Sequence, residues 1–199
     1  MMTSPWGSRA AGFSLVELLV VVSVIGLLAG LSAVTIPRAI DSGKKTKAKA
    51  DLTAIVAAVK AYRQEYGKYP VAPSKMDQAS DEFNSWYGPP TTPNDSKLLM
   101  RILSGDATVA LEGMVINPKG VRFLEGAGSD GTFQDPWGNQ YAVKMDTNES
   151  GGVEYYNPAG GNAENLRVSV IAVSLGKNKI QEDPDKKATK TCDDVFSWR

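Results

Sequence analysis

The first residues that could do chemistry are Gly12, Phe13 and Glu17, which stand at the start of a long apolar run. From Phe13 to Ile36 there are 24 residues, and Glu17 is the only charged residue among them. A helix of that length covers about 36 Å, enough to cross the hydrocarbon core of a bilayer. A carboxylate in that core costs on the order of 2–4 kcal/mol, so it usually has a partner. A cut between Gly12 and Phe13 would create an α-amine one helical turn from Glu17, and the two charges could neutralise each other within a chain or between chains.

Gly12, Phe13 and Glu17 together resemble the N-terminal signal of the type IV pilin and type II secretion pseudopilin family. In that family a short polar leader ends in Gly, Phe is the first mature residue and Glu is the fifth. The resemblance implies that a prepilin peptidase removes residues 1–12 and N-methylates Phe13, and that Glu17 acts in assembly. The alternative is an ordinary anchor or signal peptide with a stray Glu. A secretory signal, however, has an apolar core of about 7–15 residues, which is shorter than this run.

The charges balance overall but are distributed unevenly along the chain. Residues 38–70 carry eight Lys or Arg and three Asp or Glu, whereas residues 71–199 carry 13 basic and 18 acidic residues. A basic stalk and an acidic head could attract each other between copies, or both could simply be solvated faces. The basic residues that follow the apolar run favour a cytoplasmic C-terminal side. The family resemblance implies the opposite orientation, with a single-pass anchor in the bacterial inner membrane and the head in the periplasm.

Two residue types limit the chemistry of the head. The chain has no histidine, which excludes a Ser-His-Asp triad, a Cys-His dyad and a His-based zinc site. Cys192 is the single cysteine, so it cannot form a disulfide within the chain or a thiolate metal cluster. Without a His to activate it, Cys192 is expected to be a small loop residue rather than a nucleophile.

A second apolar pattern follows the membrane run and predicts that the helix continues. Apolar residues recur there at spacings of three and four, which places them on one stripe of a helix. Pro37 lies inside the pattern and should kink the helix. Gly67, followed by Tyr69-Pro70, should end it, and this ending also resembles major pseudopilins. The stripe consists of Ala48, Leu52, Ile55, Val56, Val59, Tyr62 and Tyr66.

After the helix, the sequence predicts an irregular middle and a small sheet. Residues 71–96 are rich in Pro, Ser, Asn and Asp, which favours loops, and residues 97–105 predict a short second helix. This middle is longer than in the usual major pseudopilin. Turn residues separate the strand-like runs that follow, which predicts a small antiparallel sheet laid on the helix. The runs are residues 121–124, 140–145, 152–156 and 166–173.

Residues 135–138, Asp-Pro-Trp-Gly, predict a type I turn, because Asp is favoured first, Pro second and Gly fourth. The segment resembles the DPWG-x-x-Y motif of major pseudopilins, with Tyr141 in the position of the aromatic residue. We expect its role to be structural.

The C-terminal loop contains the only plausible metal ligands. Residues 174–180 and 192–198 resemble the two ends of the calcium-binding loop of major pseudopilins, which implies Asn178, Asp193 and Asp194 as ligands. Calcium takes six to eight oxygen ligands, and these side chains supply oxygen. Asn178 replaces an Asp of the family, however, and Lys177 and Lys179 flank it with positive charge. The nearby Glu182, Asp183 and Asp185 could compensate for these changes in charge. The alternative is a plain acidic loop in which these three residues are solvated. Residues 129–135 are a lesser calcium-binding candidate, because they lack the full set of ligand positions of an EF-hand.

The fold class predicted is α+β and pilin-like: a long N-terminal helix, transmembrane in its first half, packed by its second half on a small antiparallel sheet. The expected segments are a leader at 1–12, a transmembrane helix at 13–36, the periplasmic half of the helix at 37–67, and a head at 68–199, with a loop-rich middle at 71–120 and a C-terminal sheet and loop at 121–199.

The resemblance implies a structural subunit of a periplasmic pseudopilus in a type II secretion system, not an enzyme. Its partners would be copies of itself, minor pseudopilins, the prepilin peptidase and the inner-membrane assembly platform, with no nucleic acid expected. One alternative is a type IV pilin serving adhesion, twitching or DNA uptake. Another is a membrane-anchored periplasmic binding domain, in which Trp86 and Tyr87 of the long middle would line a ligand surface.

Overall fold

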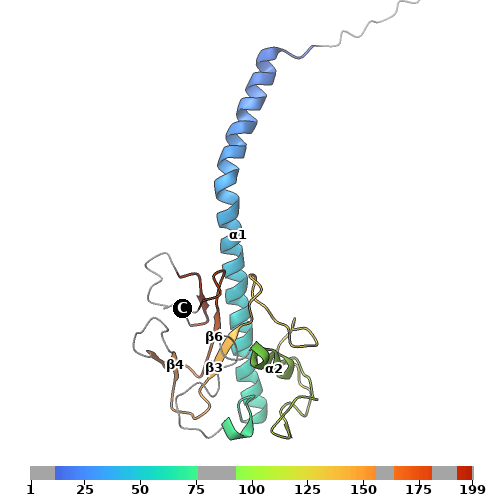
Figure 1. Cartoon of the computed structure of the whole chain (residues 1–199), viewed down its shortest axis with the longest axis vertical. Coiled ribbons are helices and arrows are strands. Elements are labelled where there is room, and N and C mark those ends of the chain that lie inside the picture. Colours follow the sequence, from blue (N-terminus) through green and yellow to red (C-terminus); the bar gives the residue numbers. More distant parts are fainter. Residues whose placement is uncertain (1–11, 76–92, 156–163, 181–191, 199) are drawn as a thin grey trace, which may run out of the picture. The chain divides into compact units, whose positions relative to one another are not determined.

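The computed structural model describes residues 12–75, 93–155, 164–180 and 192–198 of the chain. The chain divides into two compact units, residues 1–42 and 43–199. Its architecture is α+β, as predicted: helix α1 (Leu15–Tyr66) is long and N-terminal, and small antiparallel sheets follow it (Figure 1).

The first unit contains the apolar part of α1. This helix is long and apolar enough to cross a membrane, and none of its apolar stretch is buried within the protein. The hydroxyl groups in this stretch bond to the carbonyls of the preceding helical turn. Ser23 donates to the Leu19 carbonyl at 2.7 Å and Ser32 donates to the Leu28 carbonyl at 2.8 Å. No hydrogen bond to solvent is therefore required of these two hydroxyls, which suits a bilayer interior.

The second half of α1 belongs to the second unit and carries the predicted stripe. The stripe residues Ala48, Leu52, Ile55, Val59 and Tyr62 are buried. Val56 and Tyr66 are partly buried and pack against the same core. The helix is continuous through Pro37 and ends after Tyr66. The kink expected at Pro37 stays a prediction. Gly67 closes it in the left-handed conformation (φ 69°), where its N–H donates to the Arg63 carbonyl at 2.8 Å, as the sequence predicts.

Helix α2 (Pro93–Leu103) adds four buried side chains to the core. It begins four residues before the predicted start, with Pro93 at a first-turn position where a missing N–H costs little. Its buried side chains are Leu99, Met100, Ile102 and Leu103. The middle of the chain also contains a 3-10 turn, η1 (Pro73–Lys75), and a short hairpin of β1 (Ala110–Leu111) and β2 (Met114–Val115).

The main sheet has three antiparallel strands in the order β3-β6-β7. These are β3 (Ala142–Met145), β6 (Val170–Ser174) and β7 (Val195–Phe196). Val143 is opposite Ala172, and Val173 is opposite Phe196. A separate hairpin joins β4 (Val153–Tyr155) to β5 (Glu164–Leu166). The predicted run at 166–173 is therefore divided between two sheets.

The prediction of a strand at residues 121–124 is wrong. The backbone N–H groups of Phe123 and Leu124 both donate to the Leu103 carbonyl, at 2.8 and 2.9 Å. These amides therefore satisfy the C-terminal end of α2 instead of forming a ladder with another strand.

Two apolar clusters hold the second unit together. The larger one joins α1 and α2 to one face of the sheet, where Val143 and Ala172 are fully buried beside Leu52 and Tyr62. The smaller one lies around Tyr155, Phe196 and Trp198, whose rings are in mutual contact at centroid distances of 5.0–5.9 Å.

A fully buried amide, Asn117, joins the middle of the chain to both helices. Its Oδ1 accepts a hydrogen bond from the Tyr66 hydroxyl at 2.6 Å, and its Nδ2 donates to the Ile102 carbonyl at 2.8 Å. Nδ2 and Oδ1 also bond to the Val121 carbonyl and N–H, at 2.8 and 3.1 Å. The Asn117 side chain thus helps to tie the predicted loop-rich middle to the core.

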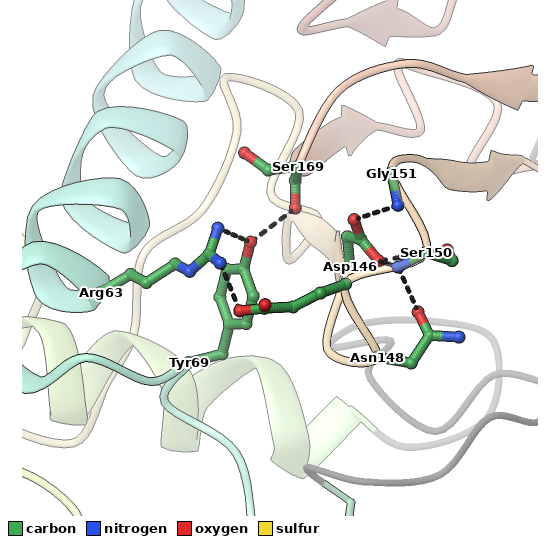
Figure 2. Close-up of polar contacts among 8 residues, drawn as sticks. Arg63, Tyr69, Asp146, Asn148, Ser150, Gly151 and Ser169 are labelled. Atoms are coloured by element: carbon green, nitrogen blue, oxygen red, sulfur yellow. Dashed lines mark hydrogen bonds and ion pairs between the residues drawn. The ribbon is translucent and has the colours of Figure 1, made fainter.

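The end of α1 is attached to the head through Arg63 and Tyr69 (Figure 2). The guanidinium donates to the Tyr69 hydroxyl at 3.0 Å, lies 4.7 Å from the centre of that ring, and pairs with Glu149. The Tyr69 hydroxyl donates in turn to the Ser169 carbonyl at 3.4 Å. The Tyr-Pro ending predicted from the sequence therefore serves as an anchor between the helix and the sheet region.

Candidate functional site

The predicted processing site lies where α1 begins. Phe13 is 76% exposed and lies two residues before the first residue of the helix, and a Cβ added to Gly12 would meet no atom within 4 Å. The leader residues 1–11 are outside the described residues. The Gly12–Phe13 bond therefore joins a small residue to an exposed phenylalanine outside the helix.

Glu17 forms a capping interaction with Ser14. Its Oε2 accepts a hydrogen bond from the backbone N–H of Ser14 at 2.8 Å, and the Ser14 carbonyl accepts from Leu18 N–H at 3.2 Å. This is the backbone half of a capping box, in which an acid three residues after the N-cap satisfies an unbonded N–H. Sequence reasoning assigned Glu17 to an amine and overlooked this bond, although Ser-x-x-Glu before an apolar run is a signal for it.

The arrangement places a carboxylate at the positive end of the helix dipole, where it is favoured. It also places the carboxylate against the backbone N–H of Ser14. Ser14 is the residue next to Phe13, where cleavage would create an amine. The Glu17 side chain can therefore receive a hydrogen bond from its own chain and still carry the charge that an amine would neutralise.

Two of the three predicted calcium ligands are brought together by the structure. Asp193 Oδ2 accepts hydrogen bonds from the N–H groups of Lys177 and Asn178, at 2.7 and 3.0 Å. Asn178 Oδ1 accepts from Ile180 N–H at 2.8 Å. Asp194 follows in sequence and is only 4% exposed. The Asp193 carboxylate thus fastens the end of the C-terminal loop to its start.

The three side chains offer oxygen atoms, which calcium prefers, but they offer fewer of them than calcium binds. Two carboxylates and one amide are oxygen donors of the kind calcium prefers, but calcium takes six to eight oxygens. Within the described ranges, no group of three or more His, Cys, Asp or Glu is placed to hold a metal ion. Glu182, Asp183 and Asp185 lie outside the described residues. Calcium binding therefore stays a prediction.

The Asp135 turn forms as predicted and reaches further than the sequence indicates. Gly138 N–H donates to the Asp135 carbonyl at 2.9 Å, which closes the turn. The Asp135 carboxylate, in a residue that is 4% exposed, accepts from Trp137 N–H at 3.0 Å and from the Ser174 hydroxyl at 2.6 Å. The link to Ser174, 39 residues away, gave no signal in the sequence.

Asn139 completes this link. Its N–H and side-chain Nδ2 donate to the two oxygens of Asp135, at 2.8 and 3.1 Å. Its Nδ2 also donates to the Gly176 carbonyl at 2.6 Å. The turn before the sheet is therefore bonded directly to the first residues of the C-terminal loop.

The lesser calcium candidate at residues 129–135 is a locally bonded turn. Asp130 accepts hydrogen bonds from the Thr132 hydroxyl at 2.6 Å and from Thr132 N–H at 3.0 Å. These bonds, with a weaker contribution from the Lys97 amine 3.6 Å away, lower the pKa of the Asp130 carboxyl. Hydrogen bonds within the turn account for its order.

Three other residues, Cys192, Trp86 and Tyr87, were singled out in the sequence. Cys192 is half-buried and packs against the smaller apolar cluster, consistent with a small loop residue. Trp86 and Tyr87, on which a ligand surface would depend, lie outside the described residues.

Comparison with known proteins connects these features to a family. A family model described as the prokaryotic N-terminal methylation motif matches residues 7–33. The chain is 40% identical over 62 residues to the type II secretion system core protein G of Pseudomonas aeruginosa, a match that covers 31% of this chain and 44% of that relative. The matched part thus spans less than half the length of the relative. No solved structure matches the chain. By its methylation motif and this partial similarity, the chain resembles the family of type IV pilins and type II secretion pseudopilins.

Proposed function

We propose that this chain is a structural subunit of a periplasmic pseudopilus in a type II secretion system. It would be made as a precursor, cut between Gly12 and Phe13 by a prepilin peptidase, and N-methylated on Phe13. The observation that carries the proposal is the start of α1, where the methylation motif coincides with an exposed apolar helix whose single early charge is Glu17. The similarity to a type II secretion core protein supports the secretion branch.

The subunit would be held in the bacterial inner membrane by the first part of α1, with the head in the periplasm. The apolar side chains exposed along this part of the helix would contact lipid before assembly and other subunits afterwards. Its partners would be copies of itself, minor pseudopilins and the inner-membrane assembly platform. No described feature of the head supports an enzymatic activity.

Mass spectrometry of the mature chain tests processing. The chain purified from cells with an active prepilin peptidase should begin at N-methylated Phe13. The Gly12→Leu variant should remain uncut and membrane-bound, because the peptidase site must accept the smallest residue before the bond. Gly7→Leu, a substitution of the same type inside the leader, should still be cut. A start near Val34, or an intact N-terminus in the wild type, would contradict the proposal.

A type IV pilin is the second candidate, because the methylation motif alone does not separate the two branches. Electron microscopy of cells that overproduce the secretion system separates them. Filaments that contain this chain and appear only when the secretion genes are overexpressed support the pseudopilus. Long surface pili made of this chain without those genes would favour the pilin.

We further propose that the C-terminal loop binds calcium through Asn178, Asp193 and Asp194. Bound calcium would supply positive charge that draws these oxygens together. Millimolar calcium should then raise the melting temperature of the detergent-solubilised mature chain by several degrees, because a ligand at a hundredfold excess over its Kd adds about 2.7 kcal/mol. Asp194→Ala should abolish the shift and Asp130→Ala should preserve it. An unchanged melting curve in millimolar calcium would show that packing of Phe196 and Trp198 holds the loop instead.

A further inference from the structure

The carboxylate of Asp135 is buried and accepts four hydrogen bonds. Two come from the backbone N–H groups of its own turn, at Trp137 and Asn139. The other two come from side chains, Asn139 Nδ2 at 3.1 Å and the Ser174 hydroxyl at 2.6 Å. The turn itself needs only the first two. The second pair points away from the turn, toward the start of the C-terminal loop.

Both side chains that bond to Asp135 also hold Gly176. Asn139 Nδ2 donates to the Gly176 carbonyl at 2.6 Å, and the Ser174 hydroxyl oxygen accepts from Gly176 N–H at 3.3 Å. The two peptide groups that flank this glycine are therefore both fixed by partners of Asp135. Ser174 is fully buried and Asn139 is 8% exposed, so water competes little for these bonds.

Gly176 has a conformation that other residues rarely adopt. Its φ is +62°, and a Cβ at this position would lie 2.5 Å from the Asp193 carbonyl oxygen. The backbone of the loop start therefore lies directly against Asp193. From that position the next two amides, of Lys177 and Asn178, reach Asp193 Oδ2 at 2.7 and 3.0 Å.

These contacts form one continuous series, from Asp135 through Ser174 and Asn139 to Gly176 and then to Asp193. We propose that Asp135 is a positioning residue for the C-terminal loop, which sets Gly176 so that Asp193 can bind the amides of residues 177 and 178. The loop start depends on this series because Lys177, Asn178, Lys179 and Ile180 are all exposed and bury little apolar surface. Where apolar contacts are few, local order rests on hydrogen bonds.

Amide hydrogen exchange of the full-length mature chain in detergent, with a calcium chelator present, tests this assignment. Asp135→Asn should disrupt the bonds to Ser174 and Asn139, because an amide nitrogen replaces one acceptor oxygen. The amides of Lys177 and Asn178 should then exchange at least tenfold faster, while those of Val143 and Ala172 in the sheet change much less. Asp130→Asn is the matched control, because the hydrogen bonds of Asp130 go to its own turn; it should leave residues 177 and 178 unchanged.

Ser174→Ala provides a milder second variant that removes one link and keeps the Asp135 turn. It should also accelerate exchange at residues 177 and 178 more than in the sheet. Unchanged exchange at these two amides in both variants would overturn the inference. An equal acceleration throughout the sheet would also overturn it, because Asp135 would then act on global stability alone.

The functional consequence rests on the proposed calcium site. If Asp135 positions Gly176 and Asp193, then Asp135→Asn should raise the calcium concentration at half-saturation several-fold, whereas Asp130→Asn should not. The exchange experiment is performed in chelator and decides the positioning role alone. A wild-type chain that binds no calcium would therefore count against the calcium proposal and not against the role of Asp135.

Discussion

The phenol of Tyr141 donates a 2.8 Å hydrogen bond to the carboxylate of Asp51, which joins the residue before β3 to the second half of α1. Tyr141 is fully buried, so this bond lies at the edge of the main core rather than on the surface. Burial, and then the bond to Asp51, raise the pKa of the Tyr141 phenol well above its usual value. The aromatic residue of the predicted turn motif thus docks the sheet on the helix.

Replacing Asp51 by Asn should lower the pKa of Tyr141 while leaving it above 10. The carboxylate is one cause of the raised value, but burial is the larger one and remains. Loss of a charge-assisted hydrogen bond should also reduce the free energy of unfolding by about 1–2 kcal/mol. The phenol is titrated by ultraviolet absorption, and the titration curve of the Tyr141→Phe variant is subtracted to isolate the signal of Tyr141. Glu65→Gln, an exposed change on the same helix, should alter stability by less than about 0.5 kcal/mol.

The head should lose stability as the pH rises above about 10. Burial raises the pKa of both the Tyr62 and Tyr141 phenols above the unfolded value near 10. The folded state therefore holds these protons more tightly, and its advantage is complete below pH 10 and declines above it. Melting curves between pH 8 and 11.5 should show a falling melting temperature. The double variant Tyr62→Phe, Tyr141→Phe should show a shallower decline, and an identical slope would contradict this explanation.

Asn117→Leu should be strongly destabilising, by about 2–4 kcal/mol. The substitution leaves the Tyr66 hydroxyl and the Ile102 and Val121 backbone groups without their amide partner inside the protein. Chemical denaturation of the detergent-solubilised chain measures the loss. Lys119→Ala, two residues along on the surface, should cost less than about 0.5 kcal/mol because exposed ion pairs contribute little. A small loss for Asn117→Leu would mean that water replaces the amide.

Two substitutions at Glu17 separate its charge from its hydrogen bond. Glu17→Gln keeps an acceptor for Ser14 N–H but removes the charge, whereas Glu17→Leu removes both. If the charge offsets the Phe13 amine of a neighbouring subunit, both variants should be inserted and cleaved, yet form few filaments. Loss of anchoring cannot be the cause, because each change removes a charge that is costly in the membrane.

Filament yield and cleavage of the Glu17 variants are measured together by sedimentation and mass spectrometry. Normal assembly of Glu17→Gln with poor assembly of Glu17→Leu would show that the cap matters and the charge does not. A wild-type yield from Glu17→Leu would remove any assembly role for this side chain.

The helices were predictable because their signals are local. The buried stripe of α1 and its end at Gly67 follow from spacing and from one residue type. The predicted strand at 121–124 failed because the amides of Phe123 and Leu124 bond to the end of α2, a partner that a local pattern cannot reveal. The run at 166–173 was divided for a similar reason, since its first residue pairs with Val153 and its later ones with β3.

The candidate sites divide in the same way. Gly12, Phe13 and Glu17 are six residues or fewer apart, so their types and spacing were enough to single them out. The series from Asp135 to Asp193 joins three segments that are distant in sequence, around residues 135–139, 174–178 and 193, and only the fold brings them together. Ser174 and Asn139 are ordinary polar residues in the sequence, and their role depends on being buried beside one carboxylate.

Lys49 donates hydrogen bonds to the carbonyls of Phe196 and Ser197, at 2.6 and 3.2 Å. The first of these contacts joins residues 147 positions apart. Ribosomes add about 5–20 residues per second, so Phe196 is synthesised roughly 7–30 s after Lys49. The apolar start of α1 is complete throughout that interval, whereas β7 and the smaller aromatic cluster do not yet exist. If the apolar start of α1 anchors the chain in a membrane, as proposed, its insertion can begin several seconds before the fold of the head is complete.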